Sequence, residues 1–353
     1  MKKRFDTFDT IESRSDEILD HSKVSNYLKG RLDGSNNSLD IRQFPGGKAN
    51  LTYLLDYGTH EYVLRRPPLG PIPPGAHDMK REYSVLSVLH KSYQYAPKAF
   101  IFEEDDSIIG APFFVMERKK GVVIRTEIPF DNQKIKNFGK KISIALINAL
   151  AELHNVNFHD LGLDKLGIPE GFIERQVYGW NKRWNAAKVG NLPEMDQLFS
   201  WLKSNIPYSK TISIIHNDFK LDNAMFSFEN PESINAIFDW DMCTIGDPLS
   251  DLGTLLCYWM DEEDPPFFKS LSLLPKNVSF LSRKELISEY TKINGIDISK
   301  ITFYHVLGLF RLVGIIAQIY TRYVRGQTKD KRFEVYGDAI PMIARYALKI
   351  INN

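Results

Sequence analysis

HNDFKLDNAMF (residues 216–226) and INAIFDWD (residues 234–241) decide the fold of this chain and carry its candidate chemistry. The apolar run ISII at residues 212–215, just before them, predicts a buried strand that ends in a polar loop. AMF and INAIF then flank a turn rich in polar residues around Pro231, which predicts two strands joined as a hairpin. The sequence therefore predicts a short β-ribbon next to a polar loop.

Four polar side chains are expected to meet at the open end of that ribbon. If the strands pair in simple register, Asn223 and Asp239 lie with their Cα atoms about 5 Å apart. The preceding loop brings His216 and Asp218 to the same end. Amide and carboxylate oxygens are the ligands that Mg²⁺ prefers, and a further carboxylate close by can act as a base. The alternative interpretation is a polar loop closed by Asx turns.

The rest of the chain changes character near residue 120. The segments LTYLLDY, EYVLRR and PFFVMER predict strands between residues 40 and 117, interrupted by one helix near residues 77–90. We predict an α+β fold. Its N-terminal lobe, residues 1–117, holds a lead-in helix and an antiparallel sheet, and its helical C-terminal lobe, residues 118–353, forms a cleft with the first. Apolar periodicity places helices in the second lobe at about 140–154, 174–187, 194–204, 284–293, 300–325 and 335–351.

Composition narrows the function classes. The 353 residues carry 45 Lys and Arg against 44 Asp and Glu, so no global field attracts nucleic acid. The longest apolar stretch, Val306 to Ile319, is interrupted by Arg311 and Gln318, and the N-terminus has no apolar core of a signal peptide. Two cysteines make neither a disulfide framework nor a structural zinc site. We expect a cytoplasmic protein that binds neither nucleic acid nor membranes.

The quoted stretches resemble the aminoglycoside phosphotransferase and choline kinase family, which is related to the protein kinases. The similarity runs from about Ile41 to the final helices, and within the family it is greatest to the phosphotransferase domains related to those attached to acyl-CoA dehydrogenases. The supporting stretches are FPGGKANLTYLL, YVLRRPPLG, HDMKREY, FFVMERKKG and GFIERQVYGW. The resemblance implies a protein-kinase-like fold with two lobes that uses ATP and Mg²⁺ to transfer the γ-phosphoryl group to a small-molecule hydroxyl.

The resemblance also implies roles for the polar loop and ribbon. Asp218 matches the catalytic aspartate, which accepts or orients the proton of the attacking hydroxyl. Asn223 and Asp239 match the magnesium ligands. Asp241 is expected to reach a second magnesium ion, directly or through water, or to accept a hydrogen bond within its loop. His216 is expected to prop the loop.

In the N-terminal lobe the resemblance points to a nucleotide site. Arg65 is expected to anchor the phosphates where lysine is common, with Arg66 as the alternative, and Glu82 is expected to hold that cation in place. Backbone amides of the glycine-containing loop are expected to meet the β- or γ-phosphate. The connection between the lobes is expected to contact adenine. The residues of this loop and connection are Gly46, Gly47, Lys48, Ala49, Asn50, Met116, Glu117 and Arg118.

The phosphoryl acceptor is the least determined part. Arg175, Trp180, Arg183 and Trp184 fall at helical spacing and would form a cationic, aromatic wall that favours an anionic acceptor, such as a hydroxyacyl thioester of CoA, over an aminoglycoside. The alternative is that both tryptophans are core residues. A catalytically degenerate protein that only binds a nucleotide or metabolite is the second hypothesis for the whole chain. The choice between ATP and GTP and the number of metal ions stay open.

Two further aspartates occur in GDPLSDLG at residues 246–253. Asp247 and Asp251 are interpreted as helix caps or loop braces rather than catalytic groups. A protein kinase fits poorly, because the loop reads HND rather than HRD and DWD stands where DFG is found.

Overall fold

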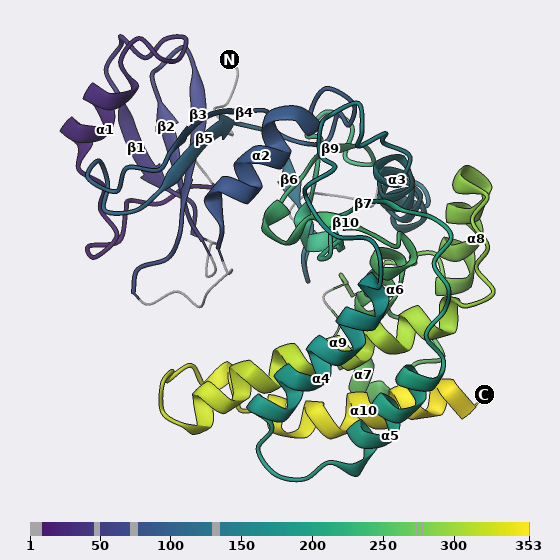
Figure 1. Cartoon of the computed structure of the whole chain (residues 1–353). Coiled ribbons are helices and arrows are strands. Elements are labelled where there is room, and N and C mark those ends of the chain that lie inside the picture. The colour runs from purple at the N-terminus through teal and green to yellow at the C-terminus, as the bar shows by residue number, and fades with distance from the viewer. Residues whose placement is uncertain are drawn as a thin grey trace. The chain divides into compact units, whose positions relative to one another are not determined.

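The computed structural model describes residues 9–45, 50–70, 77–128, 135–270, 272, 274–276 and 278–352 (Figure 1). The chain divides into two compact units. Unit 1 comprises residues 1–120 and 235–242, and unit 2 comprises residues 121–234 and 243–353. The sequence analysis placed residues 235–242 in the C-terminal lobe, whereas the structure packs them with the N-terminal residues.

Unit 1 is built on one antiparallel sheet of five strands. Its strands are β1 (Asp40–Gln43), β2 (Leu51–Asp56), β3 (Glu61–Arg66), β4 (Ala99–Glu103) and β5 (Phe113–Glu117), in the order β1-β2-β3-β5-β4. Apolar side chains at alternating positions of these strands pack into one core, in which Tyr53, Leu55 and Leu64 are inaccessible to solvent. Helix α1 (His21–Leu28), which begins at the Asp20 cap, packs its Val24 and Leu28 against this core.

One helix and one later segment complete unit 1. Helix α2 (Met79–Leu89) begins at Asp78, whose carboxylate accepts from the Arg81 amide at 3.0 Å. β9 (Ile234–Ile237) donates from the Ile237 amide to the Tyr95 carbonyl at 2.8 Å. It leads into a 3₁₀ turn, η2 (Trp240–Met242), in which Trp240 is buried edge-on against Tyr93. These contacts fix the DWD motif to unit 1.

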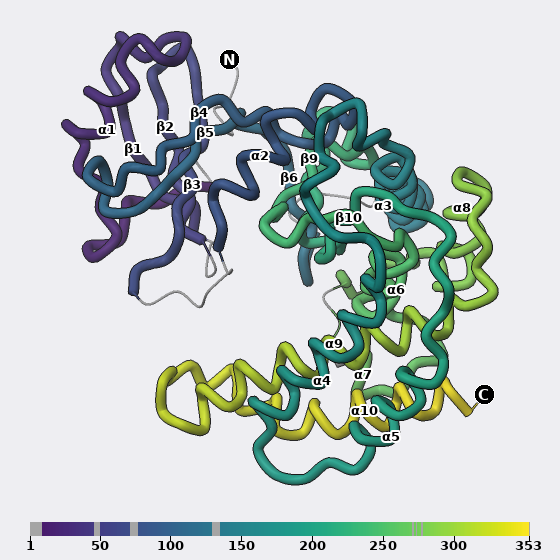
Figure 2. The backbone as a smooth tube through the Cα atoms, viewed as in Figure 1, coloured from purple at the N-terminus to yellow at the C-terminus, as the bar shows by residue number. Residues whose placement is uncertain are grey.

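Unit 2 is mainly helical, as the periodicity predicts. Figure 2 follows its backbone through the helices. They are α3 (Phe138–His154), α4 (Phe172–Ala187), α5 (Pro193–Ser204), α6 (Leu249–Tyr258), α7 (Pro266–Ser270), α8 (Arg283–Asn294), α9 (Ile301–Val324) and α10 (Tyr336–Asn352), with a 3₁₀ turn η3 (Lys331–Phe333). The short strands are β6 (Val122–Val123), β7 (Ser213–Ile215), β8 (Ala224–Phe226) and β10 (Thr244–Gly246), where β6 pairs with β8 and β7 with β10. The Ser227 amide donates to the Ser233 carbonyl at 2.9 Å, which closes the predicted hairpin turn.

Helix α9 is the centre of unit 2 and packs against α4, α6 and α10. A Cβ atom at Gly253 of α6 would lie 2.4 Å from the Tyr304 carbonyl oxygen, so the two helices approach closely only because that residue is glycine. Among the described residues, α9 alone is long and apolar enough to cross a bilayer, but 72% of its apolar window is buried inside the protein and it carries Arg311. These features are those of a core helix.

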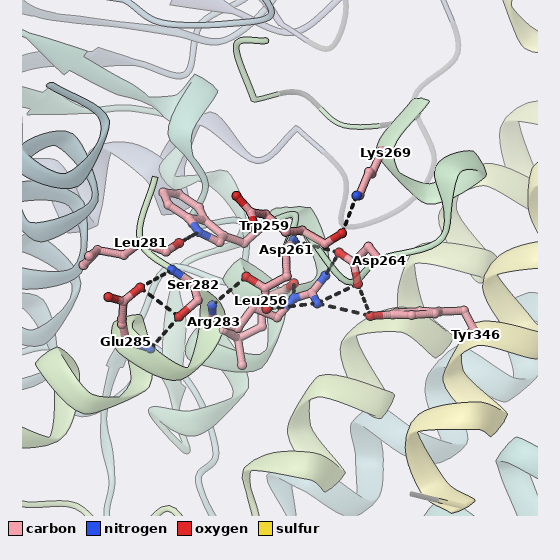
Figure 3. A network of polar contacts seen from close by, with 11 residues as sticks. Leu256, Trp259, Asp261, Asp264, Lys269, Leu281, Ser282, Arg283, Glu285 and Tyr346 are labelled. Atoms are coloured by element: carbon pink, nitrogen blue, oxygen red, sulfur yellow. Dashed lines mark hydrogen bonds and ion pairs between the residues drawn. The ribbon is translucent and has the colours of Figure 1, made fainter. Parts of the chain in front are cut away.

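A polar network joins α8 and α10 to the loop after α6 (Figure 3). The Arg283 guanidinium donates to both carboxylate oxygens of Asp264, at 2.9 and 2.7 Å, and to the Leu256 carbonyl at 3.0 Å. Tyr346 of α10 donates to the same carboxylate at 2.5 Å. Since Arg283 and Asp264 are both buried, their charges are compensated inside the core.

Candidate active site

Unit 1 holds a buried ion-pair cluster at the end of β3. Arg65 Nε lies 3.0 Å from Glu82 Oε2, and its Nη2 donates to Asp239 Oδ1 at 2.5 Å. β3 supplies the arginine, α2 the glutamate and the turn after β9 the aspartate. Glu82 is 1% exposed, whereas a third of the Asp239 side chain is accessible. The cluster therefore has a buried end at Glu82 and a solvent-facing end at Asp239.

Electrostatics keep the Arg65 guanidinium of this cluster charged. Burial alone would lower the pKa of the Arg65 guanidinium, but the carboxylates of Glu82 and Asp239 outweigh it and raise that pKa. Burial raises the pKa of Glu82, and Arg65 opposes this shift. The arginine is thus held as a fixed cation between two carboxylates.

The structure distinguishes Arg65 from the alternative, Arg66. The Arg66 guanidinium donates to the Ile109 carbonyl at 2.7 Å and to the Pro67 carbonyl at 3.4 Å. Arg65 instead contacts Glu82, as the family resemblance implies. The role of Arg65 toward a nucleotide stays a prediction.

The glycine-containing loop is described only at its end. Gly46, Gly47, Lys48 and Ala49 lie outside the described residues. Asn50 is 3% exposed, and its Oδ1 lies 2.9 Å from Nδ1 of His77, which adopts a positive φ of 57°. Burial lowers the pKa of His77, and the nearby Arg65 lowers it further. Asn50 is therefore anchored to the residue that precedes the Asp78 cap of α2.

Several groups of the connection that is expected to contact adenine are already bonded to other residues. Met116 is buried in β5. The Glu117 amide donates to the Lys98 carbonyl at 2.8 Å, and its carboxylate pairs with Lys119 at 3.0 Å. Arg118 pairs with Asp9 at 2.5 Å. The Glu117 amide is therefore already paired, and the adenine contact expected of this connection stays a prediction.

Unit 2 presents the candidate catalytic loop. Asn223, at the end of the 3₁₀ turn η1 (Leu221–Asn223), donates its amide to the Asp218 carbonyl at 2.8 Å and to Asp218 Oδ2 at 3.1 Å. Lys220 Nζ lies 3.0 Å from the same Oδ2. The structure thus brings the predicted base and one predicted metal ligand together and adds a lysine.

The sequence analysis missed Lys220. Burial would lower the pKa of its ammonium, but Asp218 and then Asp222 outweigh that effect and raise it, so the group stays protonated. Its Nζ also lies 5.2 Å from the centroid of the Tyr258 ring. The position of a lysine two residues after the candidate base could have suggested an ion pair. The sequence does not show, however, whether the lysine side chain turns back to the Asp218 carboxylate.

The backbone of the loop is braced from α6. Asp251 is fully buried and accepts from the His216 amide at 2.6 Å and from the Asn217 amide at 2.7 Å. The Asp218 amide donates to His216 Nδ1 at 3.3 Å. Asp247 accepts from the Leu249 amide and from the Tyr304 hydroxyl, at 2.9 and 2.5 Å. The interpretation of both aspartates as braces and of His216 as a prop is confirmed.

The predicted acceptor wall is largely core. Trp180 and Trp184 of α4 are 6% and 3% exposed, and Trp180 packs against Gly314 of α9. Arg175 donates to the carbonyls of Ile168 and Glu170 in the loop before its own helix. Arg183 keeps a guanidinium 4.7 Å from the Trp180 ring centroid. The core interpretation holds for both tryptophans, and their burial against α9 is the reason.

The donor set of the predicted magnesium ligands suits a hard cation. Asn223 uses its amide nitrogen toward Asp218, so its amide oxygen is directed elsewhere, and Asp239 has a second carboxylate oxygen besides the one bound to Arg65. Within the described ranges, no three His, Cys, Asp or Glu side chains form a ready-made metal cluster. Asn223 belongs to unit 2, and Asp239 and Asp241 belong to unit 1, so their approach to one another stays a prediction.

Comparisons with known proteins assign the chain to a family. The model of the Phosphotransferase enzyme family matches residues 40–272, more than half of the chain. "Acyl-CoA dehydrogenase family member 11" of Rattus norvegicus is 33% identical over 98% of this chain and 45% of its own length. "Acyl-CoA dehydrogenase family member 10" of Mus musculus is 28% identical over 95% of this chain and 31% of its own length. The chain spans less than half the length of these relatives.

Solved structures agree on the fold. A "putative aminoglycoside phosphotransferase" from Ralstonia eutropha superposes with a TM-score of 0.80 at 26% identity, over 94% of this chain and 98% of that one. A choline kinase from Cryptosporidium parvum superposes with a TM-score of 0.59 at 13% identity, over 93% and 100% of the two chains. The predicted α+β kinase-like fold with two lobes is confirmed. The chain belongs to the Phosphotransferase enzyme family.

Proposed function

We propose that this protein is an ATP- and Mg²⁺-dependent phosphotransferase that moves the γ-phosphoryl group to a hydroxyl of a small molecule. The observation that carries the proposal is the Asp218 carboxylate, which is held by Lys220 and Asn223 on a loop whose backbone is braced by Asp251. The fold is shared with a spectinomycin phosphotransferase solved with ADP and spectinomycin, at 13% identity and a TM-score of 0.58, which supports the use of a nucleotide.

Each residue then has a defined task. Asp218 accepts or orients the proton of the acceptor hydroxyl, and Lys220 fixes the position of that carboxylate through an ion pair. Asn223 holds Asp218 in place through its amide nitrogen. Arg65 binds phosphate oxygens from its fixed position between Glu82 and Asp239.

Asn223 and Asp239 are the residues proposed to hold Mg²⁺, with Asp241 as a further ligand or water-mediated contact. The ion would neutralise charge that develops on the phosphate oxygens during transfer.

An anionic acceptor fits unit 2 best. The exposed Arg183 guanidinium lies 4.7 Å from the centroid of the Trp180 ring, and Lys220 lies at the candidate base, whereas Arg311, 5.3 Å from the same centroid, is buried in α9. Cations at these places favour carboxylate- or phosphate-bearing compounds over polycationic aminoglycosides. Since the relatives named above are acyl-CoA dehydrogenase family members, a hydroxyacyl thioester of CoA is the first acceptor to test.

A nucleotide-binding protein without turnover is the second candidate. It is favoured by one observation: the predicted magnesium ligand Asp239 is paired with Arg65, the predicted phosphate anchor. If that pair persists when the nucleotide binds, Asp239 contributes one carboxylate oxygen less to the metal.

Asp218→Asn separates the two candidates. With wild-type protein, phosphate transfer is measured over a panel of CoA thioesters, choline, amino acids, sugars and aminoglycosides, each with ATP and with GTP. For the acceptor that is used, we expect the variant to lose about 10²-fold or more in kcat and to bind ATP as the wild type does. Asp164→Asn, which alters an exposed carboxylate of unit 2, is the matched control and keeps activity. ATP binding with no turnover on any acceptor selects the second candidate.

A further inference from the structure

A chain of buried polar groups leads from the candidate catalytic loop to the far helix α8. The Tyr290 hydroxyl lies 2.6 Å from His154 Nδ1, and His154 Nε2 lies 3.3 Å from Asp251 Oδ2. α8 supplies the tyrosine, α3 the histidine and α6 the aspartate (Figure 1). The aspartate is the one that accepts the His216 and Asn217 amides. This series of hydrogen-bonded side chains therefore ends at the backbone amides of the two residues that precede Asp218.

The chemistry of these groups fixes the direction of the hydrogen bonds. An ionised carboxylate only accepts, so His154 Nε2 carries a proton and donates to Asp251. In the neutral imidazole Nδ1 is then the acceptor, so the Tyr290 hydroxyl donates to it. Burial raises the pKa of Tyr290, which keeps its hydroxyl protonated and able to donate. The hydrogen bonds then run from Tyr290 to His154 and from His154 to Asp251.

We propose that Tyr290 and His154 are positioning residues for the reaction proposed above, and the inference rests on that proposed function. Asp251 Oδ2 accepts from His154 and from the His216 amide, while Oδ1 accepts from the Asn217 amide. The imidazole fixes the rotation of the carboxylate, and the carboxylate fixes the two amides. The orientation of Asp218 is thereby set from α8.

Packing alone does not explain these residue types. Tyr290 is fully buried and His154 is 6% exposed. A hydroxyl and an imidazole at such depth destabilise the fold unless they are hydrogen-bonded, and an apolar pair of similar size would fill the same space without that cost. Asn217 also adopts a positive φ of 65°, so its backbone needs an outside partner to hold it. The polar chain supplies that partner.

Tyr290→Phe removes one hydroxyl and keeps the ring, so it tests the inference with little change in packing. Amide hydrogen exchange by mass spectrometry, on full-length protein without ligands, reads the loop directly. We expect exchange in residues 213–219 to quicken by about tenfold while the rest of unit 2 is unchanged. In turnover assays kcat should fall by a similar factor, with the KM for ATP within about twofold of wild type.

Three variants control the experiment. Tyr304→Phe removes another buried hydroxyl, whose acceptor Asp247 binds the Leu249 amide at the start of α6, whereas Asp251 binds the His216 and Asn217 amides. This variant should leave exchange in residues 213–219 unchanged. His154→Gln retains an amide donor for Asp251 and should behave better than His154→Leu. If one variant folds poorly, the comparison of His154→Gln with His154→Leu still tests the hydrogen bond to Asp251.

The outcomes are distinct. Wild-type exchange in residues 213–219 of Tyr290→Phe overturns the inference, and so does a uniform rise in exchange across unit 2, which marks simple loss of stability. If no acceptor is turned over by the wild type, the proposed function fails. The exchange result still decides whether Tyr290 and His154 hold the loop.

Discussion

Two residues of the candidate site adopt backbone angles that L-amino acids rarely take. Asn217 has a φ of 65° and Asp239 a φ of 70°. Asparagine and aspartate tolerate this region better than other residues with a side chain, which explains why these residue types stand at the two bends. The strain sits next to Asp218 and at the predicted metal ligand.

Asn217→Gly and Asn217→Val should therefore differ sharply. Glycine adopts the positive φ freely, so we expect the free energy of unfolding to stay within about 0.5 kcal/mol of wild type. Valine is strained there and should lose about 1–3 kcal/mol. Urea denaturation measures both. Equal stability of the two variants would contradict the assignment of strain to this bend.

Arg65→Lys tests the phosphate anchor. A lysine offers a single nitrogen in place of the Nε and Nη2 that contact Glu82 and Asp239, and it makes no bidentate contact to phosphate. We expect ATP with Mg²⁺ to bind about tenfold more weakly in calorimetric titration. Arg66→Lys is the matched control, because that guanidinium donates to the Ile109 carbonyl and should leave ATP affinity unchanged. A larger effect at Arg66 would reverse the assignment.

At the scale of elements, α9 carries a histidine that the core keeps neutral. His305 is 8% exposed, and burial lowers its pKa from 6.5 to about 3, with Arg283 lowering it and Asp264 opposing that effect. Between those two pH values the unfolded chain binds a proton that the folded chain does not. The folded state therefore loses stability as the pH falls below about 6.5.

His305→Asn isolates this contribution. The wild type should lose about 2 kcal/mol more than the variant between pH 7 and pH 5, because asparagine does not titrate. Urea denaturation at the two pH values gives the difference, and all other titrating groups cancel in the comparison. Parallel loss in both proteins would show that His305 is protonated in the folded state.

At the scale of the whole molecule, a bound ligand adds to the stability of the folded protein. A ligand that binds only the folded protein stabilises it by about 2.7 kcal/mol at a hundred times its Kd. Magnesium-dependent stabilisation can therefore test Asn223 and Asp239 as ligands.

ATP with Mg²⁺ should raise the midpoint of thermal unfolding more than ATP with EDTA. We expect Asn223→Ala and Asp239→Ala each to remove most of that difference, since each deletes one oxygen ligand. Asp164→Asn serves again as the unchanged control. A magnesium effect that survives in either alanine variant would exclude that residue as a ligand.

Much of the fold could be predicted because it depends on local patterns. Apolar periodicity predicted α3, α4, α5, α8, α9 and α10 within about two residues of their observed ends, and strand composition predicted β2, β3 and β5. The motif spacing predicted the loop with Asp218 and Asn223, because residues five apart in one loop have little freedom to separate. Their position at the start of a predicted helix identified Asp247 and Asp251 as caps or braces.

The sequence by itself determined most of the candidates for the chemistry, and the tertiary structure decided which of them contact one another. The Arg65–Asp239 pair joins positions 174 residues apart, and the Tyr290–His154 pair joins positions 136 apart. Neither pairing follows from periodicity, since periodicity describes one element and not its neighbours. Packing also buried Trp180 and Trp184 against α9 and turned Lys220 toward Asp218. Contacts between distant segments are set by the shape of the whole core, which no local pattern encodes.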